Sequence, residues 1–169
     1  NKTVAEEYFW MNYPFVYRIH EKPDSESIMK LKTFMAGLGI KFSVNPDNVH
    51  PKALSQILDK MQDDNRLPMV TAVMLRSMQK ARYSTECTGH YGLAFKYYCH
   101  FTSPIRRYPD LLIHRIIKAH INKTLNSEML SHFSSIANKA AEQSSLTEIR
   151  AQKMERKIEK IKKAQYMEN

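Results

Sequence analysis

Residues 100–110 read HFTSPIRRYPD, and this stretch predicts how the second half of the chain folds. Ser103 followed by Pro104 is typical of a helix start, because a capping hydroxyl precedes a proline at the first helical position. Pro109 lies inside the same stretch and interrupts a continuing helix. We therefore expect one helical turn, a kink, and then a helix over 110–121.

The same stretch gathers side chains that suit a phosphate group. A helix N-terminus presents unpaired N–H groups and the positive end of the helix dipole. Arg106 and Arg107 add two guanidinium groups that bind phosphate oxygens in pairs, and Ser103 adds a hydroxyl donor. Tyr108 offers a ring on which a base can stack, an interaction worth about 1–3 kcal/mol. The residues predict a phosphate-binding site with a stacking platform.

Two other interpretations of these residues remain open. On an ideal helix Arg106, Asp110 and His114 share one face, so Asp110 could orient Arg106 or His114 instead of meeting a ligand. Alternatively, Ser103 and Pro104 only cap the helix, the arginines lie on a solvated face paired with Asp110, and the aromatic rings belong to the core. Both alternatives give the same residues a structural role.

The remaining pattern predicts an α+β chain that is predominantly helical, with a few strands or extended segments. Capping residues, prolines and the spacing of apolar residues place these elements along the chain. Up to residue 102 they are a helix over 2–12, a short strand or extended segment over 15–20, a helix capped by Asp24 or Ser25 that ends at Gly37 or Gly39, helices that begin at Pro51 and after Pro68, and loop and strand over 83–102.

Two helices are predicted after the stretch around Arg106. The first covers residues 127–141, and residues 145–148 (SLTE) form a capping box that starts a second helix running to about Met167. Residues 150–163 alternate basic and acidic side chains, which is typical of a solvated helix face with local ion pairs.

The composition excludes several classes of protein. The 169 residues are 43% hydrophobic with only 4 Gly and 7 Pro, which argues against disordered, collagenous and low-complexity chains. No apolar stretch approaches the length of about 18 residues that a membrane-spanning helix needs. Cys87 and Cys99 cannot build a disulfide scaffold, so a reducing, cytoplasmic compartment is expected.

The charge balance indicates the kind of partner. The chain holds 26 Lys and Arg against 17 Asp and Glu, which gives a net charge of +9. An excess of positive charge suits an anionic partner, with nucleic acid first and an anionic membrane surface second.

Metal-binding patterns are weak in this sequence. The neighbouring Asp63 and Asp64 are typical of a solvated turn. Zinc would need a CxxC or HxxxH spacing, which the nearby cysteines and histidines lack, namely Cys87, His90, Cys99 and His100. The residues themselves predict no metal site within this chain.

Matching segments of a known family run through nearly the whole chain. The match is densest over residues 90–94 (HYGLA), residues 98–111 (YCHFTSPIRRYPDL) and residues 114–115 (HR). Residues 17–23 (YRIHEKP) and 75–84 (LRSMQKARYS) add to it. Positions in the last predicted helix also match, namely Ser145, Glu148, Arg150, Ala151, Glu155 and Arg156. The sequence resembles the ribonuclease II / ribonuclease R (RNB) family, and the ribonuclease R branch more closely.

The resemblance implies an enzyme and assigns roles by position. Members of this family degrade single-stranded RNA processively from the 3′ end, releasing nucleoside 5′-monophosphates, with two Mg²⁺ ions held by clustered aspartates. Arg106 would contact the scissile phosphate and Glu155 would lie near the RNA end, both as catalytic residues. The supporting RNA-binding positions would be Ser103, Arg107, Tyr108, His114 and Arg115.

The family pattern also implies what surrounds this chain. The aspartate cluster and a catalytic glutamate are expected upstream of Asn1, with cold-shock domains before them and an S1 RNA-binding domain downstream. Residues 1–169 would then be a single partial RNB catalytic domain of a longer, monomeric enzyme, inactive alone because the Mg²⁺ ligands lie upstream. Lys157 departs from the family, which commonly has an acid there, and His90 and Tyr83 are expected to be structural.

Two other function classes are consistent with the sequence. A non-catalytic nucleic-acid-binding helical module would bind through charge, with an affinity that falls steeply with salt and without hydrolysis. A helical structural or interaction module with an incidental basic face would show no salt-dependent binding of nucleic acid.

Overall fold

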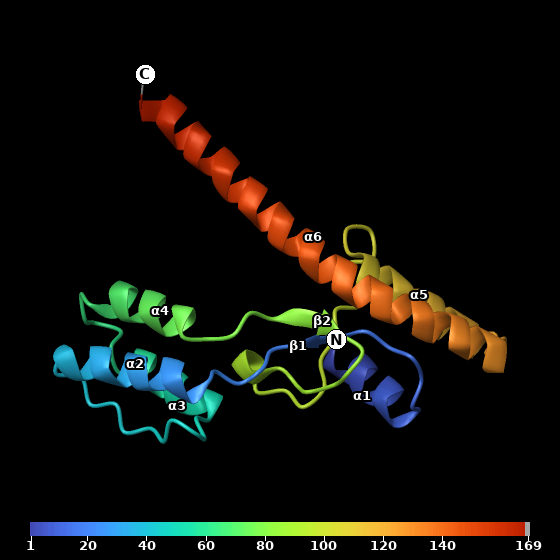
Figure 1. Cartoon of the computed structure of the whole chain (residues 1–169), viewed down its shortest axis with the longest axis horizontal. Coiled ribbons are helices and arrows are strands. Elements are labelled where there is room, and N and C mark those ends of the chain that lie inside the picture. The colour runs from blue at the N-terminus through green and yellow to red at the C-terminus, as the bar shows by residue number, and fades with distance from the viewer. Residues whose placement is uncertain (168–169) are drawn as a thin grey trace.

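The computed structural model describes residues 1–167, which form one small sheet between two groups of helices. The elements are, in chain order, α1 (Lys2–Trp10), β1 (Tyr17–Ile19), α2 (Ser25–Gly37), α3 (Pro51–Asp59), α4 (Leu67–Arg76), β2 (Arg82–Ser84), the 3₁₀ helix η1 (Tyr91–Leu93), α5 (Tyr108–Ile121) and α6 (Ser127–Met167). Helices α2, α3 and α4 lie on one side of the sheet, and α1, α5 and α6 on the other (Figure 1). The predicted α+β class with a helical majority is confirmed.

The sheet consists of two antiparallel strands, with Arg18 of β1 opposite Tyr83 of β2. Strand β1 also bonds to the segment that follows β2. The Arg18 N–H donates to the Tyr98 carbonyl (2.9 Å), and the His20 N–H donates to the Gly89 carbonyl (3.0 Å). All of β1 is therefore buried, and the loop before α5 is fixed beside it.

The main hydrophobic core joins the sheet to α1, α5 and α6. It contains Phe15 and Ile19 from the β1 segment, Ile113 from α5 and Ala137 from α6, none more than 1% exposed. Burying each large apolar side chain is worth about 1.5–3 kcal/mol. This core fixes α5 and α6 against the sheet, and thereby places the residues that precede α5.

A second hydrophobic cluster lies among α2, α3 and α4. Ile28, Leu54 and Val70 contribute one buried side chain from each of these helices. Tyr91 of η1 belongs to the same cluster, so the segment after β2 connects this group of helices to the sheet.

Local capping rules place the first helices correctly. The Asp24 carboxylate accepts the Ser27 N–H (2.7 Å) at the start of α2. Pro51 and Pro68 lie in the first turns of α3 and α4, where a missing N–H costs nothing. The predicted N-terminal helix and the strand that follows it are confirmed with shorter bounds.

The predicted turn after Ser103 and the helix that ends at Ile121 are found, but the cap at Ser103 and the kink at Pro109 are wrong. The Ser103 carbonyl accepts the N–H groups of Arg106 (3.3 Å) and Arg107 (3.1 Å), which closes an isolated turn. Helix α5 begins only at Tyr108, with Arg107 as its N-cap residue in an extended conformation. Pro109 occupies the first turn of α5, where its ring is tolerated, so it starts the helix instead of bending it.

The predicted break between two C-terminal helices is also wrong, because α6 runs without interruption. The Ser145 hydroxyl donates to the Ala141 carbonyl (2.8 Å) and accepts the Tyr83 N–H (3.0 Å), so it does not cap a new helix. Glu148, the acid of the predicted capping box, binds Arg18 instead. Contacts with the sheet override the local capping pattern.

The ion pair between Arg18 and Glu148 attaches α6 to the sheet. The Arg18 guanidinium donates to both carboxylate oxygens of Glu148, from Nη1 to Oε2 (2.6 Å) and from Nη2 to Oε1 (3.0 Å). The guanidinium also lies over the Tyr83 ring, 4.6 Å from its centroid. Arg18 is 9% exposed, so its charge depends on this partner for stabilisation.

The part of α6 beyond Glu148 extends away from the rest of the molecule (Figure 1). Every residue from 149 to 167 is exposed, which confirms the predicted solvated face. The predicted local ion pairs are not formed over 150–163, all of which the structure describes. Within residues 1–167 no helix combines the length and apolar character needed to cross a membrane.

Replacing Glu148 by Gln should destabilise the protein, because the nearly buried Arg18 loses its counter-charge. Breaking a fully buried pair costs about 3–5 kcal/mol, so we expect about 2 kcal/mol for this partly exposed glutamate, measured by urea unfolding. Glu142→Gln, at an exposed position of α6, should change the free energy of unfolding by less than about 0.5 kcal/mol. Equal losses in the two variants would contradict the role of the pair.

The free energy of unfolding should fall as the pH falls from about 6.5. Burial lowers the pKa of His90 and of His100 from 6.5 to about 4, helped by the charges of His20 and Arg18 at His90 and of Arg107 and Arg18 at His100. Between those values the unfolded chain binds protons that the folded chain does not, which costs up to about 2 kcal/mol per histidine by pH 5.

The measurement is urea unfolding between pH 7 and pH 5. The double variant His90→Gln, His100→Gln should show a flatter dependence on pH, whereas His132→Gln, at an exposed position, should not. If the free energy of unfolding of the double variant falls with pH as steeply as that of the unmodified protein, groups other than His90 and His100 are responsible for the pH dependence.

Candidate functional site

The arginine turn, residues 103–107, is held from inside by a buried carboxylate. Asp110 is 0% exposed. Its Oδ2 atom accepts the Ser103 N–H (2.8 Å) and the Nη2 of Arg107 (2.7 Å). Asp110 therefore binds Arg107, as the structural alternative expected for that arginine, whereas its pairing with Arg106 or His114 is not found.

His114 is turned toward the segment before the arginine turn. Its Nε2 lies 2.9 Å from the Phe101 carbonyl oxygen, and its ring stacks on the Phe101 ring with centroids 4.3 Å apart. Arg115 is exposed on α5. These two predicted RNA-binding residues lie apart from the cleft that the turn forms with α6.

A cleft of about 430 Å³ lies between the arginine turn and α6. Three predicted site residues line it together, namely Arg106, Arg107 and Tyr108. The opposite wall comes from α6, and the remaining lining residues are Tyr83, Pro109, Ser144, Thr147, Glu148 and Ala151. The Tyr108 ring is 45% exposed and is accessible for stacking.

Of the two arginines that line this cleft, and Arg18 which contacts its wall residues Tyr83 and Glu148, only Arg106 has no carboxylate partner among the described residues. Arg18 is paired with Glu148, and Arg107 is paired with Asp110. Arg106 is exposed, and its guanidinium forms no hydrogen bond or ion pair with any residue of the described range 1–167. An anion that enters the cleft therefore meets Arg106 as the available guanidinium.

Tyr83 was expected to be structural. In the structure it also forms part of the cleft wall. Its hydroxyl lies 2.9 Å from Nδ1 of His100, and burial raises the pKa of the phenol. The Arg18–Glu148 pair behind this ring was not predicted. The only indication in the sequence was an arginine between apolar residues of a predicted strand, at Arg18.

Glu155 lies outside the lining of the cleft but on the same side of α6. Glu148, Ala151 and Glu155 follow one another at intervals of three and four residues, which places them on one helix face. Glu155 is exposed, one turn beyond the cleft wall. An extended ligand that leaves the cleft along α6 would meet this carboxylate.

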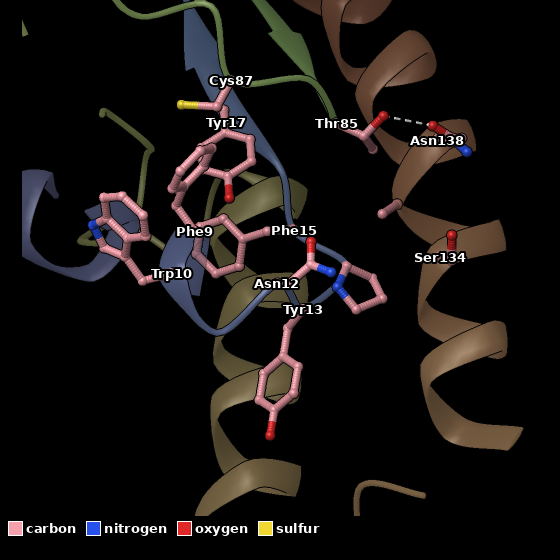
Figure 2. Close-up of a pocket in the computed structure, with 12 residues that line it drawn as sticks. Phe9, Trp10, Asn12, Tyr13, Phe15, Tyr17, Thr85, Cys87, Ser134 and Asn138 are labelled. Carbon is pink, nitrogen blue, oxygen red and sulfur yellow. Dashed lines mark hydrogen bonds between the residues drawn. The ribbon is translucent and has the colours of Figure 1, made fainter. Parts of the chain in front are cut away.

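A larger cavity, of about 570 Å³, lies elsewhere in the molecule. Figure 2 shows the rings of Phe9, Phe15 and Tyr17 gathered on one side of it and Ser134 and Asn138 of α6 on the other. Its lining residues include no charged side chain. A phosphate group would have no cation there, so this cavity is not the candidate phosphate site.

Acidic and sulfur-containing side chains are dispersed through the described structure. Asp64 pairs with Arg66 in an exposed turn (2.6 Å), which lowers the pKa of the Asp64 carboxyl to about 2. Cys87 and Cys99 are free thiols. Within residues 1–167 no three His, Cys, Asp or Glu side chains come together in a metal-binding arrangement.

Sequence comparison relates the chain to a group of ribonucleases. The family model described as RNB domain matches residues 1–123, which include the arginine turn. Ribonuclease R of Thermotoga maritima is 39% identical over 169 residues, covering 99% of this chain and 24% of that protein. Ribonuclease R of Mycoplasmopsis pulmonis is 42% identical over 171 residues, covering 100% of this chain and 23% of that protein. The chain thus spans about a quarter of these relatives.

Solved structures show the same arrangement of elements. The apo form of Mycoplasma genitalium RNase R superimposes with a TM-score of 0.87 and 29% identity, covering 93% of this chain and 25% of that chain. The same protein in complex with double-stranded RNA also gives a TM-score of 0.87. Yeast Ssd1, described as a pseudonuclease, gives 0.64 with 27% identity, covering 86% of this chain and 19% of that chain.

The pseudonuclease shares the fold, so the fold alone does not establish hydrolysis. Membership of the family is a separate matter, and it rests on a match over most of the sequence and on whole-chain relatives near 40% identity. The chain belongs to the RNB domain family, and the relatives described above include ribonuclease R proteins.

Proposed function

We propose that this chain is part of a processive 3′-to-5′ exoribonuclease that hydrolyses single-stranded RNA to nucleoside 5′-monophosphates. The observation that carries the proposal is the uncompensated guanidinium of Arg106 in a cleft whose other lining arginine, Arg107, is paired with Asp110. Related structures support it, because Mycoplasma genitalium RNase R has been solved with double-stranded RNA and with ribose-methylated single-stranded RNA.

Arg106 would contact the scissile phosphate. Negative charge develops on the phosphate oxygens as the bond to the leaving oxygen breaks, and a fixed guanidinium stabilises that charge more than it stabilises the bound substrate. The turn holds the backbone of Arg106 in place through the Ser103 carbonyl, so little reorganisation is needed during the reaction. Arg106 therefore acts mainly on turnover.

The neighbouring residues would bind the RNA rather than act on its phosphate. Tyr108 offers an exposed ring for base stacking, and Arg107 supports the cleft floor while bound to Asp110. Ser103, His114 and Arg115 would hold adjoining parts of the RNA or of the turn. Their separation from the cleft makes these weaker contacts.

Glu155 would meet the RNA one helical turn beyond the cleft. Its place on the same face of α6 as Ala151 supports this role. Lys157, two residues further along, lies on a different side of the helix, where it would not offset the charge of Glu155 directly.

We propose Mg²⁺ as the cofactor of the whole protein, with ligands outside this chain. The described residues do not provide a metal-binding set, so no step of the reaction is assigned to a metal here. Asn1 lies close to the site, because its side-chain oxygen accepts the Phe101 N–H (3.0 Å). A segment joined upstream of Asn1 would therefore start beside the residues that lead into the arginine turn.

The free thiols Cys87 and Cys99 suit a reducing compartment, so we place the protein in the cytoplasm. We also propose that the protein is a monomer.

A second candidate function is favoured by the similarity to the pseudonuclease Ssd1. A non-catalytic RNA-binding module would show salt-dependent binding to RNA and no hydrolysis by the full-length protein.

Arg106→Ala in the full-length protein should lower turnover by about 100- to 1,000-fold, because one preorganised donor to the developing charge is lost. The dissociation constant for single-stranded RNA should change by less than about threefold, since many other contacts bind the RNA. Single-turnover kinetics and equilibrium binding separate the two effects. Arg76→Ala, at an exposed position of α4, is the matched control and should change neither. Normal turnover with a large loss of affinity would contradict the assigned role.

Residues 1–169 alone should not degrade a 3′-tailed RNA in the presence of Mg²⁺, because two-metal hydrolysis requires ligands that the described part, residues 1–167, does not bring together. The assay is gel electrophoresis of end-labelled RNA, with the full-length protein as the positive control. Release of mononucleotides that stops on adding a chelator would refute the prediction.

A further inference from the structure

Asp110 and Arg18 are the charged side chains buried in the described structure, and Asp110 is the more deeply buried of the two. Both of its side-chain bonds are made by one oxygen, Oδ2, to the N–H of Ser103 and to the guanidinium of Arg107. Its Oδ1 has no partner among residues 1–167. A carboxylate that is buried with one oxygen unsatisfied is costly, so stability alone does not account for an acid at this position.

The two bonds of Asp110 act on both sides of Arg106 in the chain. Ser103 lies three residues before Arg106 and is held through its N–H, while its carbonyl binds the N–H of Arg106. Arg107 lies immediately after and is held through its guanidinium. The backbone of Arg106 is therefore bounded on both sides by groups that one buried carboxylate fixes.

The same bonds separate the two adjacent arginines. Asp110 draws the guanidinium of Arg107 inward, where its side chain is 20% exposed, while Arg106 has no carboxylate partner and remains exposed. Without Asp110, two unpaired guanidinium groups would compete at the cleft, and the turn would lose its internal bond at Ser103. A displacement of about 1 Å at a catalytic group can cost about 100-fold in rate.

We propose that Asp110 is a positioning residue for Arg106, which acts on turnover by fixing the arginine turn. The inference rests on the proposed function, because it takes Arg106 as the group that contacts the scissile phosphate. Asp110 itself lies inside the protein and would not touch the RNA.

The test is a double-variant cycle in the full-length protein. Asp110→Asn keeps an oxygen for the Ser103 N–H but removes the charge that holds Arg107, and it should lower single-turnover kcat by about 10- to 100-fold with an RNA dissociation constant within about threefold. In the Arg106→Ala background the same change should lower kcat by less than about twofold, because the group that it positions is gone.

Asp64→Asn is the matched control, since Asp64 also binds an arginine but in an exposed turn far along the chain. It should leave kcat unchanged in both backgrounds. Thermal unfolding followed by circular dichroism checks that each variant is folded. If Asp110→Asn does not fold, Asp110→Glu, which keeps a charge beside Arg107 but shifts the carboxylate, replaces it in the same cycle with the same expectation.

Two results would overturn the inference. One is an equal loss of kcat from Asp110→Asn with and without Arg106, which would mean that Asp110 acts through another group. The other is a folded Asp110→Asn protein with normal kcat. If Arg106→Ala alone leaves kcat unchanged, the proposed function fails instead, so the two failures are distinguishable.

Discussion

The bond from the Ser103 N–H to the buried carboxylate of Asp110 is the constraint on which the candidate site depends. This bond ties the start of the arginine turn to α5, and the same Asp110 oxygen, Oδ2, also binds Arg107. A carboxylate in the first turn of a helix is favoured by the helix dipole, so Asp110 is held where it can bind both the Ser103 N–H and the Arg107 guanidinium. As a result Arg106 projects into the cleft without an internal partner.

A second carboxylate–arginine pair completes the cleft from the other side. Glu148 holds Arg18, and the guanidinium of Arg18 lies against the Tyr83 ring that forms part of the cleft wall. The two pairs fix both walls, since one belongs to the turn and the other joins α6 to the sheet. They also neutralise Arg18 and Arg107, so that Arg106 is the lining guanidinium left, among the described residues, to meet an anionic ligand.

Much of the fold could be predicted from sequence because its signals are local. Asp24 as an N-cap and Pro51 in a first turn act within a few residues, and the elements that they start are found where expected. The errors arose where distant contacts override such signals. Ser145 is part of a capping box by pattern, yet its hydroxyl binds β2 and the Ala141 carbonyl, so α6 continues.

The site was predictable to the extent that its residues are adjacent in sequence. Arg106, Arg107 and Tyr108 were expected together and line one cleft. The sequence left open whether Asp110 pairs with Arg106, Arg107 or His114, because the choice depends on the helix starting at Tyr108. The Arg18–Glu148 pair joins residues 130 positions apart, and no local pattern contains that contact.

The most direct test of this account is a structure of the full-length protein with a single-stranded RNA bound. We expect the Arg106 guanidinium at about 3 Å from an oxygen of a backbone phosphate, a hydrogen-bond distance. We also expect that Arg107 stays bound to Asp110 and that Arg18 stays bound to Glu148. A structure in which Arg106 is turned away from the RNA, while Arg107 leaves Asp110 to hold the phosphate, would contradict this account.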